Sequence, residues 1–245
     1  MILPIILFGI FLIILERIIP DRKLPSVKNW WIRVVFINLV QLLIVIIGIY
    51  TWDAWFKETQ FFQFDFLPDF ILGFLAYFVI TFIFYWWHRL RHDVNFLWLL
   101  CHQVHHSASR IETITSFYKH PLEILINSIL IGAINYLLFG LNIEAAAWSL
   151  LYTSIAEYFY HMNIRTPYVI GFFLQRPEMH RIHHKRGFHY NNFSDLPLWD
   201  MLFGTFDNPK IDSKHPCGFN TKSESNLFKM LIFKNVNKPY KKKPK

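Results

Sequence analysis

Five long apolar runs divide this chain and constrain its fold more than any other feature. A helix that crosses a lipid bilayer needs about 20 mostly apolar residues. Five segments approach that length: Ile2–Ile19, Val34–Trp52, Leu67–Trp87, Leu122–Phe139 and Ile143–Tyr160. Only 17% of the 245 residues are charged, whereas a soluble domain carries about 25%. We therefore predict an all-α, multi-pass membrane helical bundle with four or five spans.

The basic residues are distributed unevenly around these runs. Of the 25 Lys and Arg residues, 24 lie on the side shared by the first loop, the histidine-rich segments and the C-terminal segment. By the positive-inside rule, this side faces the cytoplasm and the N-terminus lies outside, in a bacterial inner membrane or the endoplasmic reticulum. The net charge of +8 and the terminal run Lys241–Lys245 fit attraction to lipid headgroups. We therefore expect a membrane and no nucleic acid as the partner of the basic residues.

Ten of the twelve histidines form clusters or stand at the ends of apolar runs. They are His88 and His92 in an HxxxH pattern, His102, His105 and His106 in an HxxHH pattern, His180, His183 and His184 in a second HxxHH pattern, and the single residues His120 and His161. Positions i, i+3 and i+4 of a helix share one face, so we expect each pattern to direct its imidazoles to a single point. Ten ligands are too many for one ion. We predict that all ten are catalytic and metal-ligating residues of a cytosolic-face di-metal site.

The ligand type narrows the chemistry of this site. Imidazole suits Fe, Zn, Cu and Ni. The two cysteines, Cys101 and Cys217, form no CxxC pattern, which argues against disulfide, iron–sulfur and cysteine-ligated zinc sites. A structural zinc site is closed by four ligands, whereas about five histidines per ion suit an iron pair that activates dioxygen against a C–H bond. We predict two iron ions, which zinc could replace in purified protein.

Acidic side chains should orient the imidazoles from behind. The candidates are Asp93, Glu123, Glu157, Glu178, Asp195 and Asp200. His189 and His215 fit neither histidine pattern, and we interpret them as ordinary loop residues.

Two other functions stay open at this point. A metal-bound hydroxide could make the protein a metal-dependent lipid hydrolase, and the chain could also be a non-catalytic membrane metal-binding protein. Axial haem ligation needs only two histidines per haem and leaves the doubled HxxHH pattern unexplained.

The histidine series and its flanking residues carry a family resemblance from Trp86 to Phe206. The flanking strings are His102-Gln103-Val104-His105-His106-Ser107, Lys119-His120-Pro121-Leu122-Glu123, His161-Met162-Asn163-Ile164-Arg165, His180-Arg181-Ile182-His183-His184 and Leu196-Pro197-Leu198-Trp199-Asp200-Met201-Leu202-Phe203-Gly204-Thr205-Phe206. Together they resemble the fatty acid hydroxylase and sterol desaturase superfamily of integral-membrane di-metal oxidoreductases. Glu157 stands where the fatty acid 2-hydroxylase branch has a further histidine, so the chain is more similar to the sterol-desaturase-like branch.

The resemblance implies a fold, an activity and partners. It implies membrane helices topped by a cytosolic site in which the same ten histidines are the ligands. It implies oxygen-dependent hydroxylation or desaturation of a lipid, with O2 as co-substrate and electrons from a separate donor protein. We accordingly expect N-terminal anchor helices in residues 1–66, a fatty acid hydroxylase-like catalytic domain in residues 67–206 and a basic C-terminal tail in residues 207–245.

Overall fold

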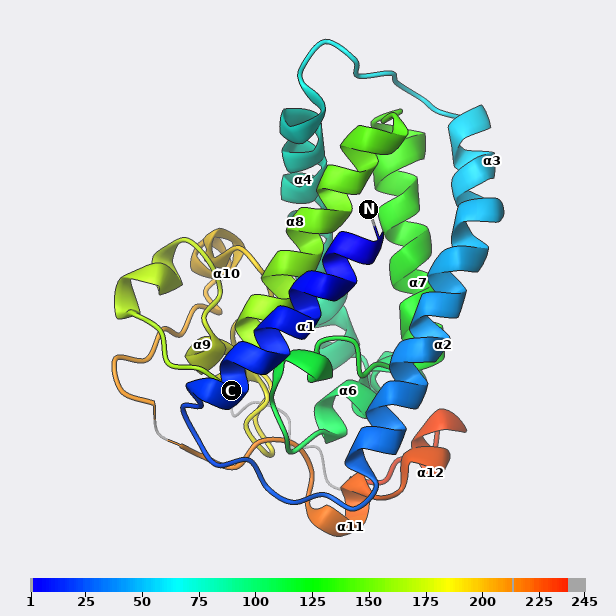
Figure 1. Cartoon of the computed structure of the whole chain (residues 1–245). Helices are drawn as coiled ribbons and strands as arrows, with labels where there is room; N and C mark the ends of the chain where they lie inside the picture. Colours follow the sequence, from blue (N-terminus) through cyan, green and yellow to red (C-terminus); the bar gives the residue numbers. More distant parts are fainter. Residues whose placement is uncertain (1, 213, 238–245) are drawn as a thin grey trace.

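Each of the five apolar runs forms a helix in the computed structural model, which describes residues 2–212 and 214–237. These long helices are α1 (Ile2–Ile18), α2 (Trp30–Tyr50), α4 (Asp69–Asp93), α7 (Pro121–Gly132), which continues as the π-helical segment η3 (Ala133–Leu138), and α8 (Ile143–His161). They run alongside one another in Figure 1. The described residues contain no β-strand, so the prediction of an all-α, multi-pass helical bundle is confirmed.

Three helical stretches are long and apolar enough to cross a membrane. They are Trp30–Glu58, in which α2 is followed by α3 (Trp52–Glu58), Asp69–Asp93 and Pro121–Leu138. The other two runs are shorter or more polar: α1 has 17 residues, and α8 carries Glu144 and Glu157. Leucines on the outer face of α2, such as Leu39 and Leu43, are exposed. This apolar exterior belongs to a membrane protein.

The helices that carry histidines are packed closely together. Gly73 on α4 lies so near α8 that an added Cβ would be 2.6 Å from the carbonyl oxygen of Ala145. Small residues allow such close approach of helix backbones. Leu72 and Ala76 of α4 form a buried cluster with Ala145 and its neighbours. This contact sets the separation of α4 and α8.

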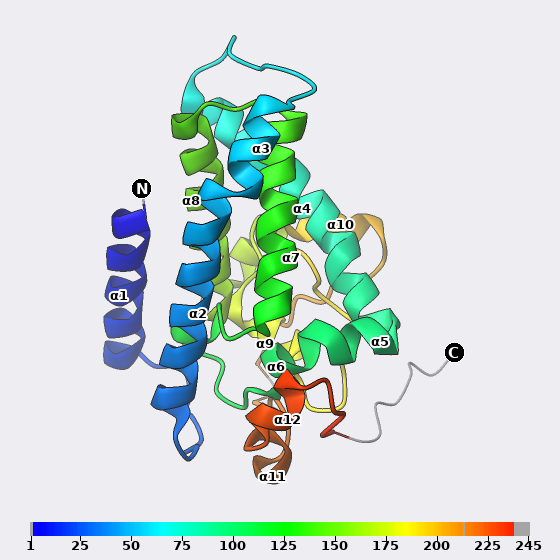
Figure 2. The same cartoon turned by 90° about the vertical axis from the view of Figure 1, so that its right-hand side faces the viewer.

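The remaining short elements lie between the middle and one end of the bundle, with α10 near mid-height (Figure 2). They are α5 (Asn95–Leu97), the π-helical η1 (Trp98–His102), α6 (Gln103–Ser107), the 3-10 segments η2 (Thr113–Thr115) and η4 (Tyr168–Phe172), α9 (Pro177–His183), α10 (Pro197–Leu202), α11 (Thr221–Glu224) and α12 (Leu227–Leu231). Phe219 and Met230 from the C-terminal segment pack in one core with Trp98 and Tyr118. The predicted basic run Lys241–Lys245 lies outside the described residues.

Candidate metal centre

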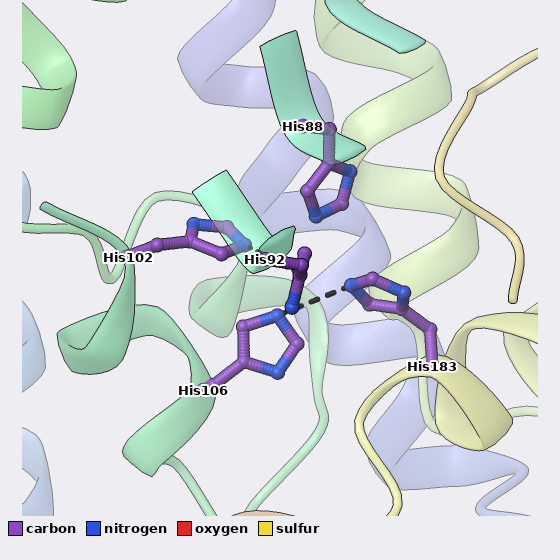
Figure 3. Close-up of side chains that lie close together, drawn as sticks. All are labelled: His88, His92, His102, His106 and His183. Carbon is purple, nitrogen blue, oxygen red and sulfur yellow. Dashed lines mark hydrogen bonds between the residues drawn. The ribbon is translucent and has the colours of Figure 1, made fainter. Parts of the chain in front are cut away.

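Nine of the ten predicted histidines converge in two adjacent groups. The first group is His88, His92, His102, His106 and His183, and the second is His105, His161, His180 and His184. Within each group one ligand atom per residue lies within 4.8 Å of all the others. Figure 3 shows the five rings of the first group pointing toward one another from α4, η1, α6 and α9. The groups have the form of two neighbouring nitrogen-rich metal sites.

Each HxxHH pattern is divided between the two groups, which corrects the expectation that each pattern serves a single point. His102 and His106 belong to the first group, whereas His105 between them belongs to the second. The second pattern is divided in the opposite sense. His180 and His184 belong to the second group, and His183 belongs to the first. Residues four apart stay nearly in line on a helix, but neighbouring residues diverge by about 100°, so adjacent histidines reach different centres.

The ring nitrogens lie at distances that suit metal ligation. Four Nε2–Nε2 distances are 3.0–3.1 Å, between His92 and His102, His106 and His183, His161 and His180, and His180 and His184. Two nitrogens that bind one ion at about 2.1 Å and at right angles would be about 3.0 Å apart. The dashed line in Figure 3 marks the contact between His106 and His183. The donor set therefore fits a metal ion in each group.

Backbone carbonyl oxygens lie within hydrogen-bond distance of the Nδ1 atoms of several rings. Nδ1 of His88 lies 2.8 Å from the Phe193 carbonyl oxygen, Nδ1 of His161 lies 2.8 Å from that of Glu157, and Nδ1 of His183 lies 2.8 Å from that of Asn191. When Nδ1 donates its proton to such an acceptor, Nε2 carries the lone pair. Nε2 of His88 is buried without a hydrogen-bond partner among the described residues. An ion would supply the partner that this nitrogen lacks.

Burial keeps these imidazoles neutral. Burial lowers the pKa of His183 to about 3 and lowers the pKa of His102, His105 and His184 well below the ordinary value. A histidine must be unprotonated to bind a metal. The protein environment therefore holds the ligands in the form that binds an ion.

Ion pairs stand next to both groups. The guanidinium of Arg91 pairs with Glu123, whose carboxylate oxygens lie 3.2 and 3.3 Å from Nδ1 of His102. The Lys119 ammonium donates to both carboxylate oxygens of Glu157 at 2.7 and 2.8 Å. Glu123 thus orients a candidate ligand directly, as expected of an acidic residue that contacts a metal-binding histidine from outside the metal site.

A cavity opens between these pairs and the histidines. Its lining includes His88, His102, His105 and His180, the charged residues Arg91, Lys119, Glu123, Glu157 and Asp195, and the rings of Phe84, Phe193 and Tyr160. The cavity is therefore in contact with both groups, and a small molecule within it would lie beside either centre.

Asp200, Glu178 and Asp93 form hydrogen bonds or ion pairs with groups other than the histidine rings. Asp200 accepts hydrogen bonds from the backbone N–H groups of Phe193 and Ser194. Glu178 binds Thr166 and Arg176. The Asp93 side chain is exposed and pairs with Arg89 on the same helix. Asp200 and Glu178 thus hold backbone N–H groups near the site.

His120 lies in neither group. Its Nδ1 accepts a hydrogen bond from the Leu122 N–H and so caps α7, and its Nε2 lies 3.3 Å from the Leu231 carbonyl oxygen. Pro121 follows His120 at the first position of that helix, which is a common start signal. Both ring nitrogens of His120 are therefore engaged with backbone groups.

His189 is the residue whose location the sequence pattern missed. Its ring lies 5.6 Å from His92 and 4.6 Å from His106, measured between ring centroids, and the residue is buried. Its position five residues after His184 was the available signal, although that spacing matches no helical ligand pattern. His215 is outside this cluster, and its Nε2 lies 2.8 Å from the Arg181 carbonyl oxygen.

Comparison with known proteins yields one family and several distant relatives. Residues 73–205 match the family described as fatty acid hydroxylase. The chain is 28% identical over 146 residues to sphingolipid C4-hydroxylase sur2 of Schizosaccharomyces pombe, covering 58% of this chain and 50% of that protein. It is 29% identical over 138 residues to alkylglycerol monooxygenase of Homo sapiens, covering 54% and 30%. It is 31% identical over 140 residues to ornithine lipid hydroxylase OlsE of Rhizobium tropici, covering 55% and 41%.

The matched stretch is only part of each relative. The chain spans half or less of the length of these three curated relatives. No solved structure matches the chain.

Proposed function

Since this chain belongs to the fatty acid hydroxylase family, we propose that it is a membrane-bound di-iron oxidoreductase. Its reaction would hydroxylate or desaturate a C–H bond of a fatty acyl or sterol-like lipid. The reaction would use O2 and electrons from a separate donor protein. The observation that carries this proposal is the convergence of nine histidines in two adjacent groups within a membrane helical bundle. The names of the relatives point the same way, since all three oxidise lipids.

Nine histidines would hold the two ions, five at the first and four at the second. When bound, two iron ions supply the oxidising chemistry that no protein side chain provides. Ligation by neutral imidazoles leaves the positive charge of the ions uncompensated. Zinc would bind the same nitrogens, so the metal found after purification need not be the active one.

The chain's own side chains would position the substrate and supply protons. The cavity touches both groups, so a lipid carbon placed in it would lie beside the ions. Burial raises the pKa of the Asp195 carboxyl to about 7, so this group at the cavity wall can bind and release a proton near neutral pH. The Lys119–Glu157 pair offers a donor and an acceptor to a polar group of the substrate. The rings of Phe84 and Phe193 limit the entry of water.

We also propose that the metal centre faces the cytoplasm, in a bacterial inner membrane or the endoplasmic reticulum. The concentration of Lys and Arg on that side of the spans supports this orientation. A reporter fused at Lys245 and found on the outer face would contradict it.

Lipid profiling tests the activity. Cells with and without the chain are grown with ample and with limiting oxygen, and their lipids are compared for a gain of one oxygen atom or a loss of two hydrogen atoms. We expect the shifted lipid only with the intact chain and with oxygen, and we expect His183→Ala to abolish it. His215→Gln is the control, since His215 lies outside both groups. Turnover that does not depend on oxygen would refute the proposal.

A further inference from the structure

Nine large apolar side chains are exposed on two short segments outside the long helices. They are Tyr168, Val169, Phe172, Phe173 and Leu174 around η4, and Leu198, Met201, Leu202 and Phe203 on and just after α10. We call these nine residues the η4–α10 patch, because the two elements pack against each other. No charged side chain of residues 168–174 or 197–203 is exposed, since the only one, Asp200, is buried. An apolar surface of this extent marks contact with a membrane or a partner.

The patch is continuous with the exposed face of α4. The Trp199 ring lies 5.1 Å from Phe78 and 4.9 Å from Phe82, measured between centroids, and its Nε1 donates to Thr81 Oγ1 at 2.9 Å. The Phe203 ring lies 4.7 Å from that of Trp86 on the same helix. The side chains of Phe82 and Trp86 are exposed. The patch thus extends the surface of a helix that is long and apolar enough to cross a membrane.

The level of the patch along α4 indicates what surrounds it. At a rise of about 1.5 Å per residue, Phe78 and Trp86 lie about 13 and 25 Å along the axis from Asp69. The hydrocarbon core of a bilayer is about 30 Å thick. In Figure 1, α10 lies at the height of the apolar helix α1, and it packs against α4. A bilayer that surrounds α4 would therefore also surround α10.

Basic side chains border the patch at one edge. The Lys210 ammonium and the Arg176 guanidinium each lie 5.8 Å from the centroid of the Tyr168 ring. Aromatic rings next to Lys or Arg are typical of the boundary between acyl chains and headgroups. This edge marks where the surface would emerge from the hydrocarbon.

We propose that the η4–α10 patch is inserted into the acyl region of the leaflet on the metal-centre side, where lipid chains cover it. Non-helical backbone at that depth must be satisfied by protein. The Asp200 carboxylate accepts from the N–H groups of Phe193 and Ser194, and the Thr205 N–H donates to the Asp200 carbonyl oxygen. The buried side of α10 thus supplies partners to the connecting backbone, while its outer side presents only apolar groups. The insertion does not depend on the proposed catalytic activity.

Site-directed spin labelling of the full chain tests the insertion. Phe173→Cys and Leu202→Cys, one from each segment, are labelled with a nitroxide in phosphatidylcholine and phosphatidylglycerol vesicles. Collision rates are measured with oxygen, which concentrates among acyl chains, and with a water-soluble nickel chelate. Leu43→Cys on the exposed face of α2 is the lipid reference, and Ser225→Cys after α11 is the water reference. The native cysteines, Cys101 and Cys217, are buried, so the unsubstituted chain gives the background.

We expect both patch positions to show an oxygen-to-nickel collision ratio as high as that of Leu43→Cys and well above that of Ser225→Cys. A ratio equal to that of Ser225→Cys would place the patch in water and overturn the proposal. Low collision rates with both reagents would show coverage by protein, such as a second copy of the chain, and would also overturn it. Agreement between the two segments guards against local disturbance by either substitution.

Discussion

The Phe193 carbonyl oxygen lies 2.8 Å from Nδ1 of His88. The N–H of the same residue, Phe193, donates to the Asp200 carboxylate at 2.8 Å. Asp200 also accepts from the Ser194 N–H at 3.0 Å and the Thr205 hydroxyl at 2.7 Å. The acidic residue of α10 thereby holds the backbone group that orients a candidate ligand on α4. The orientation of the His88 ring is thus coupled to the position of α10.

Asp200→Ala should weaken iron binding at the first group. Removal of the carboxylate frees the Phe193 backbone, so the His88 ring loses its fixed orientation. Loss of such an indirect partner typically costs about 10–100-fold in metal affinity. Iron per chain is measured by elemental analysis during titration with a chelator. Asp93→Ala, at an exposed carboxylate, should leave the titration unchanged, and an equal loss in both variants would contradict the prediction.

The two groups should lose metal separately. His183→Ala removes a ligand of the first group and His180→Ala removes one of the second. Because each group holds its own ion in the proposal, each variant should retain about one of two irons per chain. Mössbauer spectra of iron-loaded protein would distinguish the ion that remains. Loss of both ions in each variant would instead indicate a single cooperative site.

Removal of the Glu123 carboxylate should destabilise the fold. Glu123 and its partner Arg91 are both buried, so Glu123→Leu leaves an uncompensated cation. Breaking a buried pair in this way costs about 3–5 kcal/mol. The double variant with Arg91→Met should recover much of that loss, because no unpaired charge remains. The midpoint of denaturant unfolding in detergent is the measurement. Equal midpoints for the single variant and the unsubstituted protein would refute the prediction.

Gly73→Ala should force α4 and α8 apart. An added Cβ would lie 2.5 Å from the Cβ of Trp148 and 2.6 Å from the Ala145 carbonyl oxygen. Overpacking of this kind costs about 1–3 kcal/mol, and it should also reduce iron occupancy, because α4 and α8 both carry candidate ligands. Thermal unfolding and iron content are compared with those of Phe74→Ala, at the exposed neighbouring position. A Gly73→Ala protein with unchanged unfolding temperature would contradict the packing argument.

Acid should destabilise the iron-free protein. The pKa of His183 falls from 6.5 to about 3 on burial, so the unfolded chain binds a proton between these values that the folded chain does not. Stability then rises with pH across this window and is lost as pH falls from about 6.5 toward 3. The unfolding temperature of chelator-treated protein should therefore decrease between pH 7 and pH 5. A pH-independent unfolding temperature would exclude buried neutral imidazoles.

Local sequence was sufficient to predict the helices and the histidines that are candidate ligands. Runs such as Leu67–Trp87 are apolar over the length of a membrane span, and hydrophobicity acts without reference to distant residues. The α4 pair His88 and His92 was also readable, because residues four apart on one helix lie together whatever surrounds them.

Tertiary structure decided which centre each imidazole reaches. His105 and His106 are adjacent in the sequence, yet they belong to different groups because neighbouring positions on a helix point in directions about 100° apart. Which group each ring joins depends on where the other helices are placed, and the placement of α8 follows from contacts such as that of Gly73 with Ala145.

The dependence on tertiary contacts also explains why the surroundings of two histidines differed from expectation. His120 stands at the end of an apolar run, but its ring caps α7. His189 has no ligand spacing, but chain folding stacks its ring on that of His92 and places it edge-on to that of His106. The sequence by itself determined the membrane helices and the candidate metal-binding histidines, since both follow from local periodicity and composition. Only the packing of distant segments decided how those imidazoles divide between two centres, because convergence is a property of three-dimensional distance.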